Sequence, residues 1–345
     1  MTETATGSTP WHKTNSVDKR VVNYLKRLDL PPSTTIVKHL HGDASDRSYV
    51  RVILPDSSSF VLAMHPEPFA PNALPQFHVG SIFEHLGIPI PRIIDQAGDL
   101  GLLAIDDLGD ETLQNWLETN NTQDPTPLYL EAVGLIAKLQ TGAATLADGQ
   151  EGPFGLAFDT HKLDWEFDFF RSKFLETYRQ ANIASATNKA LQYELSKISS
   201  ELAAEPRVLC HRDYHSRNLM IKENNLVVID FQDARMGPNT YDLVSLLRDC
   251  YVDLPRSLVT NMITHFLSAV PMSHAVNFHD RFNLMSVQRH LKALGTFGHQ
   301  ISCLGRSEFA AYVPRTLRYL RETLHAQPRF GRLLELLARL IPELI

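Results

Sequence analysis

The 345-residue sequence has little cysteine, no long apolar run and no excess of positive charge, and each lack excludes a class of protein. Cys210, Cys250 and Cys303 are odd in number and widely spaced, so they form no disulfide or metal-binding pattern and fit a reducing compartment. No stretch approaches the roughly 20 apolar residues that a membrane helix requires. The net charge of −6 argues against a nucleic-acid partner, because such proteins present a basic face.

The remaining composition is that of an ordinary globular protein, with 43% hydrophobic and 21% charged residues. A chain of 345 residues exceeds what one hydrophobic core usually supports, so we expect two lobes. Residues 1–15 have neither the positive start nor the apolar stretch of a signal peptide, and we expect them to be disordered. We expect a cytoplasmic protein, and a monomer.

The most informative segment is 209–231. It contains an H-x-D-x-x-x-x-N loop made by His211, Asp213 and Asn218, and Asp230 ends the apolar run that follows. Phosphoryl transfer from ATP needs one carboxylate that orients the attacking hydroxyl and accepts its proton, and oxygen ligands for magnesium. Asp213 fits the first role. Asn218 and Asp230 fit the second, because Mg²⁺ is a hard cation that takes oxygen from carboxylates and substrate phosphates.

The local structure expected around this loop agrees with that chemistry. Short apolar stretches on both sides predict strands, so the loop residues and Asp230 would be aimed by rigid elements. The competing interpretation is that Asp213 and Asn218 only cap turns and Asp230 only ends a strand. It accounts for each residue separately but not for their spacing.

The loop, with Ile229-Asp-Phe231, Gly237-Pro238 and Tyr241-Asp242 downstream, resembles the aminoglycoside phosphotransferase family of protein-kinase-like small-molecule kinases. Protein kinases proper fit less well. Their catalytic loop usually has Lys two residues after the Asp, where this chain has His215, and D-F-G is replaced by D-F-Q-D.

A closer resemblance, to the bacterial anomeric kinases of N-acetylmuramate and N-acetylglucosamine, extends over nearly the whole chain. It rests on 42–51 (G-D-A-S-x-R-x-Y-x-R), 106–110 (D-D-L-G-D), 211–220 (H-R-D-Y-x-x-R-N-L-M) and 288–292 (Q-R-H-L-K). The resemblance implies transfer of phosphate from ATP, with Mg²⁺, to the anomeric hydroxyl of one of these sugars in cell-wall recycling. His215 and Ser216, beside Asp213, depart from the pattern of these kinases, so the acceptor stays open while the reaction does not.

The implied fold class is α+β: a protein-kinase-like fold with a small β-rich N-lobe over residues 16–105 and a larger, mostly helical C-lobe over 106–345. Apolar periodicity predicts a helix after Ser16 and another from Pro75 to Gly87. Alternating or β-branched runs predict five strands in the first lobe. These are expected at 35–40, 49–54, 60–64, 92–95 and 100–106.

The resemblance places the nucleotide phosphates under the turn that contains Gly42 and Ser45, whose backbone N–H groups would bind phosphate oxygens. Taken alone, this turn is equally consistent with a plain hairpin. Kinases of this superfamily usually carry a Lys on the third strand, where Met64 stands here. Arg47 or Arg51 would supply the missing charge, unless each is simply an exposed strand residue.

Asp106 and Leu108 lie in the expected hinge between the lobes, where the backbone would pair with adenine. The resemblance also assigns His211 and Asp242 to the support of the catalytic loop. For Asp242 the alternative is a carboxylate that only stabilises the first turn of a helix.

His215, Arg217, Glu166 and Arg289 are the expected acceptor-binding residues, on the catalytic loop and on helical segments at 159–180 and 278–303. Aromatic residues near Trp165 suit either a sugar site or core packing. Two alternatives to a sugar 1-kinase stay open. One is a kinase for another acceptor, such as an aminoglycoside, another amino sugar or an amino alcohol. The other is a nucleotide-binding pseudokinase, which the lack of the Lys favours and the intact acidic set opposes.

Overall fold

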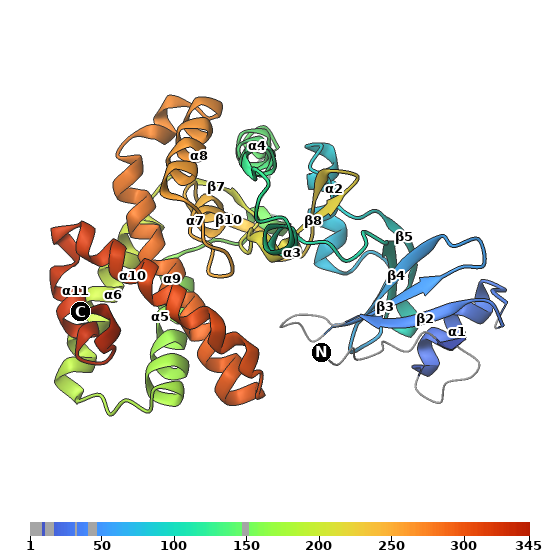
Figure 1. Ribbon diagram of the computed structural model, residues 1–345, viewed down its shortest axis with the longest axis horizontal. Coiled ribbons are helices and arrows are strands. Elements are labelled where there is room, and N and C mark those ends of the chain that lie inside the picture. Colours follow the sequence, from blue (N-terminus) through green and yellow to red (C-terminus); the bar gives the residue numbers. More distant parts are fainter. Residues whose placement is uncertain (1–8, 11–16, 32, 41–46, 147–151) are drawn as a thin grey trace.

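The computed structural model describes residues 9–10, 17–31, 33–40, 47–146 and 152–345. Figure 1 shows a sheet-containing lobe at one end of the long axis and a helical lobe at the other. The expected α+β division, with a small β-rich lobe and a larger helical one, is therefore confirmed. Here the small lobe means the sheet with α1, and the large lobe means everything from α3 onward.

The small lobe is built on a six-stranded antiparallel sheet with the strand order β1-β2-β3-β4-β6-β5. The five strands expected from the sequence are present within a few residues of their predicted bounds. The strands are β1 (Thr9–Pro10), β2 (Ile36–Leu40), β3 (Ser48–Ile53), β4 (Ser59–Met64), β5 (Ile93–Ala97) and β6 (Leu102–Asp106).

Strand β1 differs from the sequence expectation. Thr9 pairs with Val37 and Pro10 with Ile36, so these two residues extend the sheet instead of being disordered. The rest of the segment 1–15 lies outside the described residues.

Helix α1 (Lys19–Arg27) covers one face of the sheet. It begins later than the predicted Ser16, because the carboxylate of Asp18 caps it by accepting a hydrogen bond from the backbone N–H of Arg20 at 2.7 Å. Its buried side chains, Val21, Tyr24 and Leu25, form the small-lobe core with alternate residues of the strands. The opposite face of β3, β4 and β6 is thereby left to line the cavity described below.

Helix α2 (Pro75–His85) belongs to the small lobe by sequence but not by packing. It starts with Pro75 in its first turn and ends just before Gly87, as predicted. Its buried residues Val79, Ile82 and Phe83 are continuous with the hydrophobic core of the large lobe, and the ring of Phe83 lies 5.5 Å from that of Phe231. The hydrophobic core of the large lobe therefore extends to a helix that precedes the hinge in the sequence.

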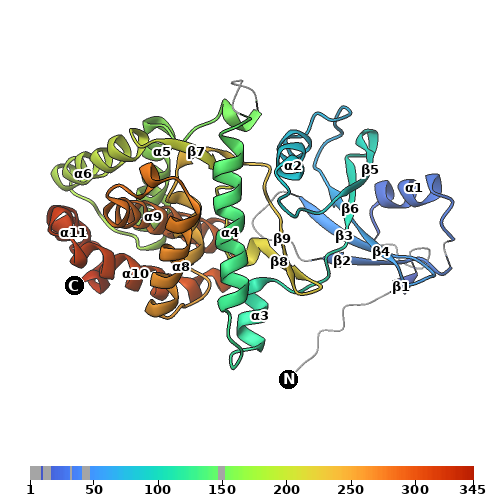
Figure 2. The ribbon, with the colours of Figure 1, turned by 90° about the horizontal axis from the view of Figure 1, so that it is seen from above.

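The large lobe consists of helices around two short β-hairpin-like pairs. Figure 2 shows α4 standing between the sheet and the remaining helices. The helices are α3 (Leu113–Thr119), α4 (Thr126–Ala143), α5 (Thr160–Phe170), α6 (Ser185–Ala203), α7 (Tyr241–Leu247), α8 (Arg256–Ala269), α9 (Phe278–Leu304), α10 (Val313–Ala326) and α11 (Gly331–Ala338). Among the described residues, none of the helices combines the length and the apolar character needed to cross a membrane.

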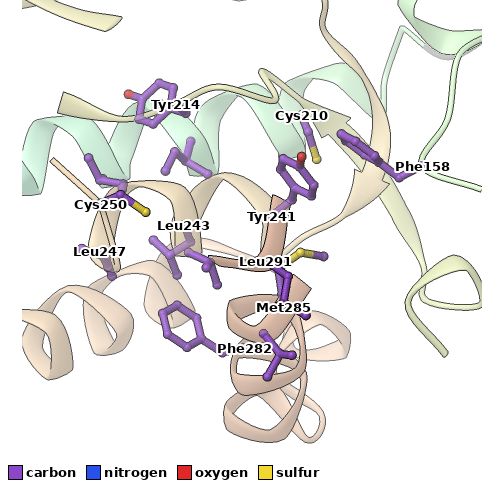
Figure 3. Packing of buried hydrophobic residues seen from close by; sticks show 14 of the residues in the cluster. Phe158, Cys210, Tyr214, Tyr241, Leu243, Leu247, Cys250, Phe282, Met285 and Leu291 are labelled. Atoms are coloured by element: carbon purple, nitrogen blue, oxygen red, sulfur yellow. The ribbon is translucent and has the colours of Figure 1, made fainter. Parts of the chain in front are cut away.

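The two strand pairs flank residues 211–218, the loop expected to be catalytic, which is called the catalytic loop below. Strand β7 (Arg207–Cys210) pairs with β10 (Arg235–Pro238), and β8 (Leu219–Lys222) pairs with β9 (Asn225–Val228). Beneath them Tyr241 stacks on Phe158 at 4.1 Å, close to Cys210, and Leu243 lies near Leu291 of α9 (Figure 3). The loop between β7 and β8 is thus fixed on a rigid apolar base.

Helix α9 packs unusually close to the end of α5, which continues as a π-helical segment, Arg171–Tyr178. Two glycines make this contact. A Cβ at Gly295 would lie 2.8 Å from Cα of Phe170, and one at Gly298 would lie 2.5 Å from the carbonyl oxygen of Lys173. Only glycine fits at such distances, so the position of α9 depends on these two residues.

Candidate active site

The catalytic loop after β7 is tied to the first turn of α7 by Asp242. One carboxylate oxygen of Asp242 accepts the backbone N–H of His211 at 2.7 Å and the other that of Arg212 at 3.0 Å. Arg212 has a positive φ of 88°, a conformation that needs such support in a non-glycine residue. Burial raises the pKa of Asp242, although His211 and the two backbone donors act in the opposite direction. The contacts are those expected of a supporting carboxylate.

His211 ties the loop to the strand that follows it. Its Nε2 lies 3.0 Å from the carbonyl oxygen of Ile229, the residue before Asp230, and the side chain is fully buried. The imidazole thus links the start of the catalytic loop to the segment that carries the second acidic residue.

A second supporting carboxylate, Asp249, was missed by the sequence analysis. Its buried side chain accepts the backbone N–H of Ser216 at 2.8 Å and that of Tyr251 at 2.8 Å. The middle of the catalytic loop is therefore fixed as firmly as its start. Its contact with the catalytic loop is not visible in the sequence, because Ser216 lies 33 residues away.

Asp213, Asn218 and Asp230 all line one cavity of about 1370 Å³. The side-chain amide of Asn218 donates to the carbonyl oxygen of Asp213 at 2.9 Å, and the backbone N–H of Ile229 donates to that of Asn218 at 3.0 Å. Asp230 has a φ of 63° and accepts the amide of Gln232 at 2.9 Å. The structure thus brings together the three residues that the spacing singled out.

The side-chain oxygens of Asn218 and Asp230 suit a magnesium ion that arrives bound to a nucleotide. The described residues contain no group of three His, Cys, Asp or Glu side chains that would hold a metal by themselves. Mg²⁺ commonly uses only one or two carboxylates and completes its shell with phosphate oxygens and water. The carboxylate of Asp230 and the amide oxygen of Asn218, both facing the cavity, fit that pattern.

Asp213 is surrounded by positive charge. Its Oδ1 lies 2.7 Å from Nζ of Lys292 and 3.8 Å from Nη1 of Arg289, and its Oδ2 lies 3.8 Å from Nε of Arg212. Burial alone would raise the pKa of Asp213, but these cations, Lys292 foremost, hold it well below its usual range. Lys292 lies on the helical segment 278–303 that was expected to wall the acceptor site, but its contact with Asp213 was not predicted.

The two arginines proposed for the nucleotide phosphates both line the cavity and both have acidic partners. Arg47 lies 3.0 Å from Asp230, so it connects the sheet to the catalytic side. Arg51 lies 2.7 Å from Asp107 and 2.8 Å from Asp110, at the hinge. Gly42 and Ser45, the other residues assigned to the phosphates, lie outside the described residues. A phosphate-binding role for Arg47 or Arg51 stays a prediction.

Met64 does not lie where the sequence analysis placed it. Its side chain is buried in the small-lobe core, whereas Val61, Ala63 and His65 of the same segment line the cavity. Alternate residues of a strand face opposite sides of a sheet, so a shift of one residue exchanges core and cavity. The residue of β4 next to Met64 that faces the cavity is therefore Ala63, which is also uncharged.

The hinge residues Asp106 and Leu108 line the same cavity. The carboxylate of Asp106 is held by Arg92, whose Nε donates to it at 2.9 Å. The next residue, Asp107, accepts Nζ of Lys222 with its carbonyl oxygen at 3.1 Å, which ties the hinge to β8. Pairing of this backbone with adenine stays a prediction.

The four expected acceptor-binding residues are gathered on one wall of the cavity, on α5, α9 and the catalytic loop. One oxygen of the buried Glu166 accepts the amide of Gln288 at 2.6 Å, and the other has no hydrogen-bond partner among the described residues. Arg289 donates to the hydroxyl of Tyr241 at 2.9 Å. The second oxygen of Glu166 lies 3.9 Å from Nζ of Lys162 and can also accept a hydrogen bond from a hydroxyl group of a ligand.

The remaining two acceptor-wall residues come from the catalytic loop. Burial lowers the pKa of His215 to about 3, with help from Arg289 and Lys292 and against the attraction of Asp213. The imidazole is therefore neutral at physiological pH. Arg217 lies 4.7 Å above the ring of Tyr251 and close to Phe309.

The aromatic residues of α5 divide between the two roles considered for them. Phe167 and Phe170 are buried in the large-lobe core, as the packing interpretation holds. Trp165 is 51% exposed and lines the cavity together with Phe169, on which it stacks at 5.4 Å. Lys162 lies 3.9 Å from the centre of the Trp165 ring.

A β-rich lobe joined by a hinge to a helical lobe, with Asp213 and Asn218 on one loop and Asp230 after the next strand, defines the protein-kinase-like class of phosphotransferases. Residues 36–275 match the phosphotransferase enzyme family, APH. The chain belongs to this family, as the resemblance predicted.

Two relatives with assigned activities cover most of the chain. One is the N-acetylmuramate/N-acetylglucosamine kinase of Neisseria meningitidis serogroup B, 30% identical, with 88% of this chain and 90% of that protein covered. Another, the N-acetylmuramate/N-acetylglucosamine kinase of Pseudomonas aeruginosa, is 29% identical, with 90% of each chain covered. The resemblance to anomeric kinases that the motifs indicated is thus matched by sequence similarity over nearly the full length of the chain.

Solved structures agree on the fold. The gentamicin complex of APH(2")-IIa superimposes with a TM-score of 0.60 at 15% identity, covering 88% of this chain and 97% of that one. Choline kinase from Cryptosporidium parvum superimposes with a TM-score of 0.58 at 15% identity, covering 92% and 98%. At such identities the likeness concerns the fold only.

Proposed function

We propose that this phosphotransferase moves the γ-phosphoryl group of ATP to the anomeric hydroxyl of N-acetylmuramate or N-acetylglucosamine, in the cytoplasm and in the recycling of cell-wall sugars. The observation that carries the proposal is the convergence of Asp213, Asn218 and Asp230 on one cavity that also reaches the hinge. The names of the relatives at 29–30% identity supply the acceptor.

The reaction follows from the residues around the cavity. The oxygen of the sugar hydroxyl forms a bond to the γ-phosphorus while the bond from that phosphorus to the bridging oxygen breaks, and its electron pair leaves on ADP. The hydroxyl proton passes to a carboxylate oxygen of Asp213. Asn218 and Asp230 would hold magnesium, which supplies neutralisation of the phosphate charge.

The charge of the acceptor wall is mixed, which does not suit a polycation. Arg212, Arg217, Arg289 and Lys292 lie there together with Glu166, Asp213 and Asp233, and Arg212 pairs with Asp233 at 2.9 Å. A wall of unpaired carboxylates would suit an aminoglycoside, which carries several ammonium groups. N-acetylated sugars carry none.

The test is product analysis with ATP, magnesium and a panel of amino sugars. The expected product is a sugar 1-phosphate, which dilute acid hydrolyses because the phosphate leaves from an acetal carbon. Blocking the anomeric position as a methyl glycoside should eliminate turnover, while a 6-deoxy sugar should still react. A phosphorylated methyl glycoside would refute the anomeric assignment and leave a kinase for another hydroxyl.

A further inference from the structure

Lys292 makes the shortest contact between a cation and Asp213. Its Nζ donates to Oδ1 of Asp213 at 2.7 Å, and its side chain is only 16% exposed. The two residues are 79 positions apart and come from different elements, the catalytic loop and α9. A partly buried pair at this distance is screened little by salt, so the charge of Lys292 acts directly on the carboxylate.

The backbone that carries Lys292 is held in place on two sides. Gly295 and Gly298 fix α9 against the end of α5, at distances that admit no side chain. One turn before Lys292, Gln288 donates to Glu166 of α5 at 2.6 Å. The position of the ammonium group is therefore set by packing and not only by its attraction to Asp213.

The catalytic loop supplies one cation to Asp213, Arg212, whose Nε lies 3.8 Å from Oδ2. Two residues after the Asp stands His215, whose imidazole is neutral because burial lowers its pKa to about 3. On β4 the cavity-facing residues are Val61 and Ala63, which are uncharged. The shortest contact between Asp213 and a cation therefore comes from another element, α9.

We propose that Lys292 is a positioning residue of phosphoryl transfer: its ammonium group, supplied from α9, holds the Asp213 carboxylate in the orientation that faces the acceptor hydroxyl. The proposal rests on the proposed function, in which Asp213 accepts the proton of that hydroxyl. Proton transfer is unchanged, since the hydroxyl proton still passes to Asp213.

The charged groups around the pair fix how it responds to pH. The charged or titratable neighbours of Asp213 are Lys292 and Arg289 from α9 and Arg212 and His215 from the catalytic loop. The neighbours of Lys292 are Arg289, Arg212, Asp213 and Glu166. Burial and Arg289 lower the pKa of Lys292 below the usual lysine value, although Asp213 raises it. Lys292 therefore loses its charge at a lower pH than an ordinary lysine.

Three variants test this with kcat and KM measured against pH. Lys292→Met leaves the Asp213 carboxylate without its partner at 2.7 Å, so kcat should fall roughly 10²-fold while the KM for ATP stays nearly unchanged. Lys292→Arg keeps a cation that does not titrate, so it should restore most of kcat and move the alkaline limb to higher pH. Lys197→Met, which changes an exposed lysine of α6 paired with Glu194, should leave kcat and the pH profile unchanged.

A second measurement needs no acceptor. The pKa of Lys292 can be followed by competitive acetylation against pH with mass spectrometry, in the intact protein and in Asp213→Asn. Loss of the carboxylate should lower the pKa of Lys292 further, while Lys197 should not change. An unchanged pKa of Lys292, or a Lys292→Met enzyme with full kcat and the original pH profile, would overturn the proposal. Coupled titration without turnover of any sugar would instead refute the proposed acceptor.

Discussion

Replacing Gly298 by alanine should separate α9 from the π-helical end of α5. The added Cβ would lie 2.5 Å from the carbonyl oxygen of Lys173 and 2.8 Å from its carbonyl carbon. Ordinary van der Waals contact begins near 3.4 Å, so the backbones must part by up to 3.4 − 2.5 = 0.9 Å. Neither neighbour is the tip of a flexible side chain, and the strain cannot be relieved by a rotamer change.

The expected loss of stability is about 1–3 kcal/mol, the usual range for overpacking, reduced by the gain of roughly 0.5–1 kcal/mol that alanine brings to a helix. Activity should fall more than stability suggests. Lys292 is six residues earlier on the same helix, and a misplacement of about 1 Å at a reacting group can cost roughly 10²-fold in rate. Thermal unfolding and kcat/KM measure the two effects.

Gly134→Ala is the matched control. Gly134 lies in α4, and a Cβ there would meet no atom within 4 Å. This variant should be stabilised by about 0.5–1 kcal/mol and remain fully active. A Gly298→Ala protein as stable and as active as Gly134→Ala would show that α9 does not depend on this close contact.

Three further predictions concern the residues of the cavity. Asp213→Asn should lower kcat by roughly 10²–10⁴-fold with nearly unchanged nucleotide binding, measured by calorimetry. Asp230→Ala should weaken magnesium-dependent nucleotide binding more than Asn218→Ala, because it removes a full charge facing the divalent cation. If Arg47 or Arg51 binds phosphate, its change to Met should raise the KM for ATP much more than the KM for the sugar.

Each of these has an outcome that contradicts it. Full activity of Asp213→Asn would remove that residue from the mechanism. Undiminished magnesium dependence in both metal-site variants would place the metal elsewhere. Unchanged ATP affinity in both arginine variants would mean that backbone groups and magnesium alone hold the phosphates.

Much of the fold was predictable because it depends on local patterns. The strands of the sheet follow from β-branched and alternating runs, and α2 from its apolar spacing, Pro75 and Gly87. The catalytic motif was recognisable because Asp213 and Asn218 lie on one short loop, five residues apart. In each case the residues that determine the feature are close in the sequence.

Features that depend on distant parts of the chain were not predictable. Lys292 and Asp213 meet only because α9 packs on α5, and nothing in either local sequence records that contact. The place of Met64 was wrong by one residue, which on a strand is enough to exchange the core face for the cavity face. The partners of Asp249 are likewise set by the packing of α7 and the catalytic loop.

The assignment of α2 to the large-lobe core has a mechanical consequence. A rotation of the sheet over the cavity would carry α1 with it and leave α2 behind, attached to Phe231 beside the catalytic loop. The ion pair between Arg47 and Asp230 joins the sheet side of the cavity to the segment that follows β9. If Asp230 holds magnesium as proposed, the metal would compete with Arg47 for the same carboxylate, and binding of the nucleotide would then weaken this link between the lobes.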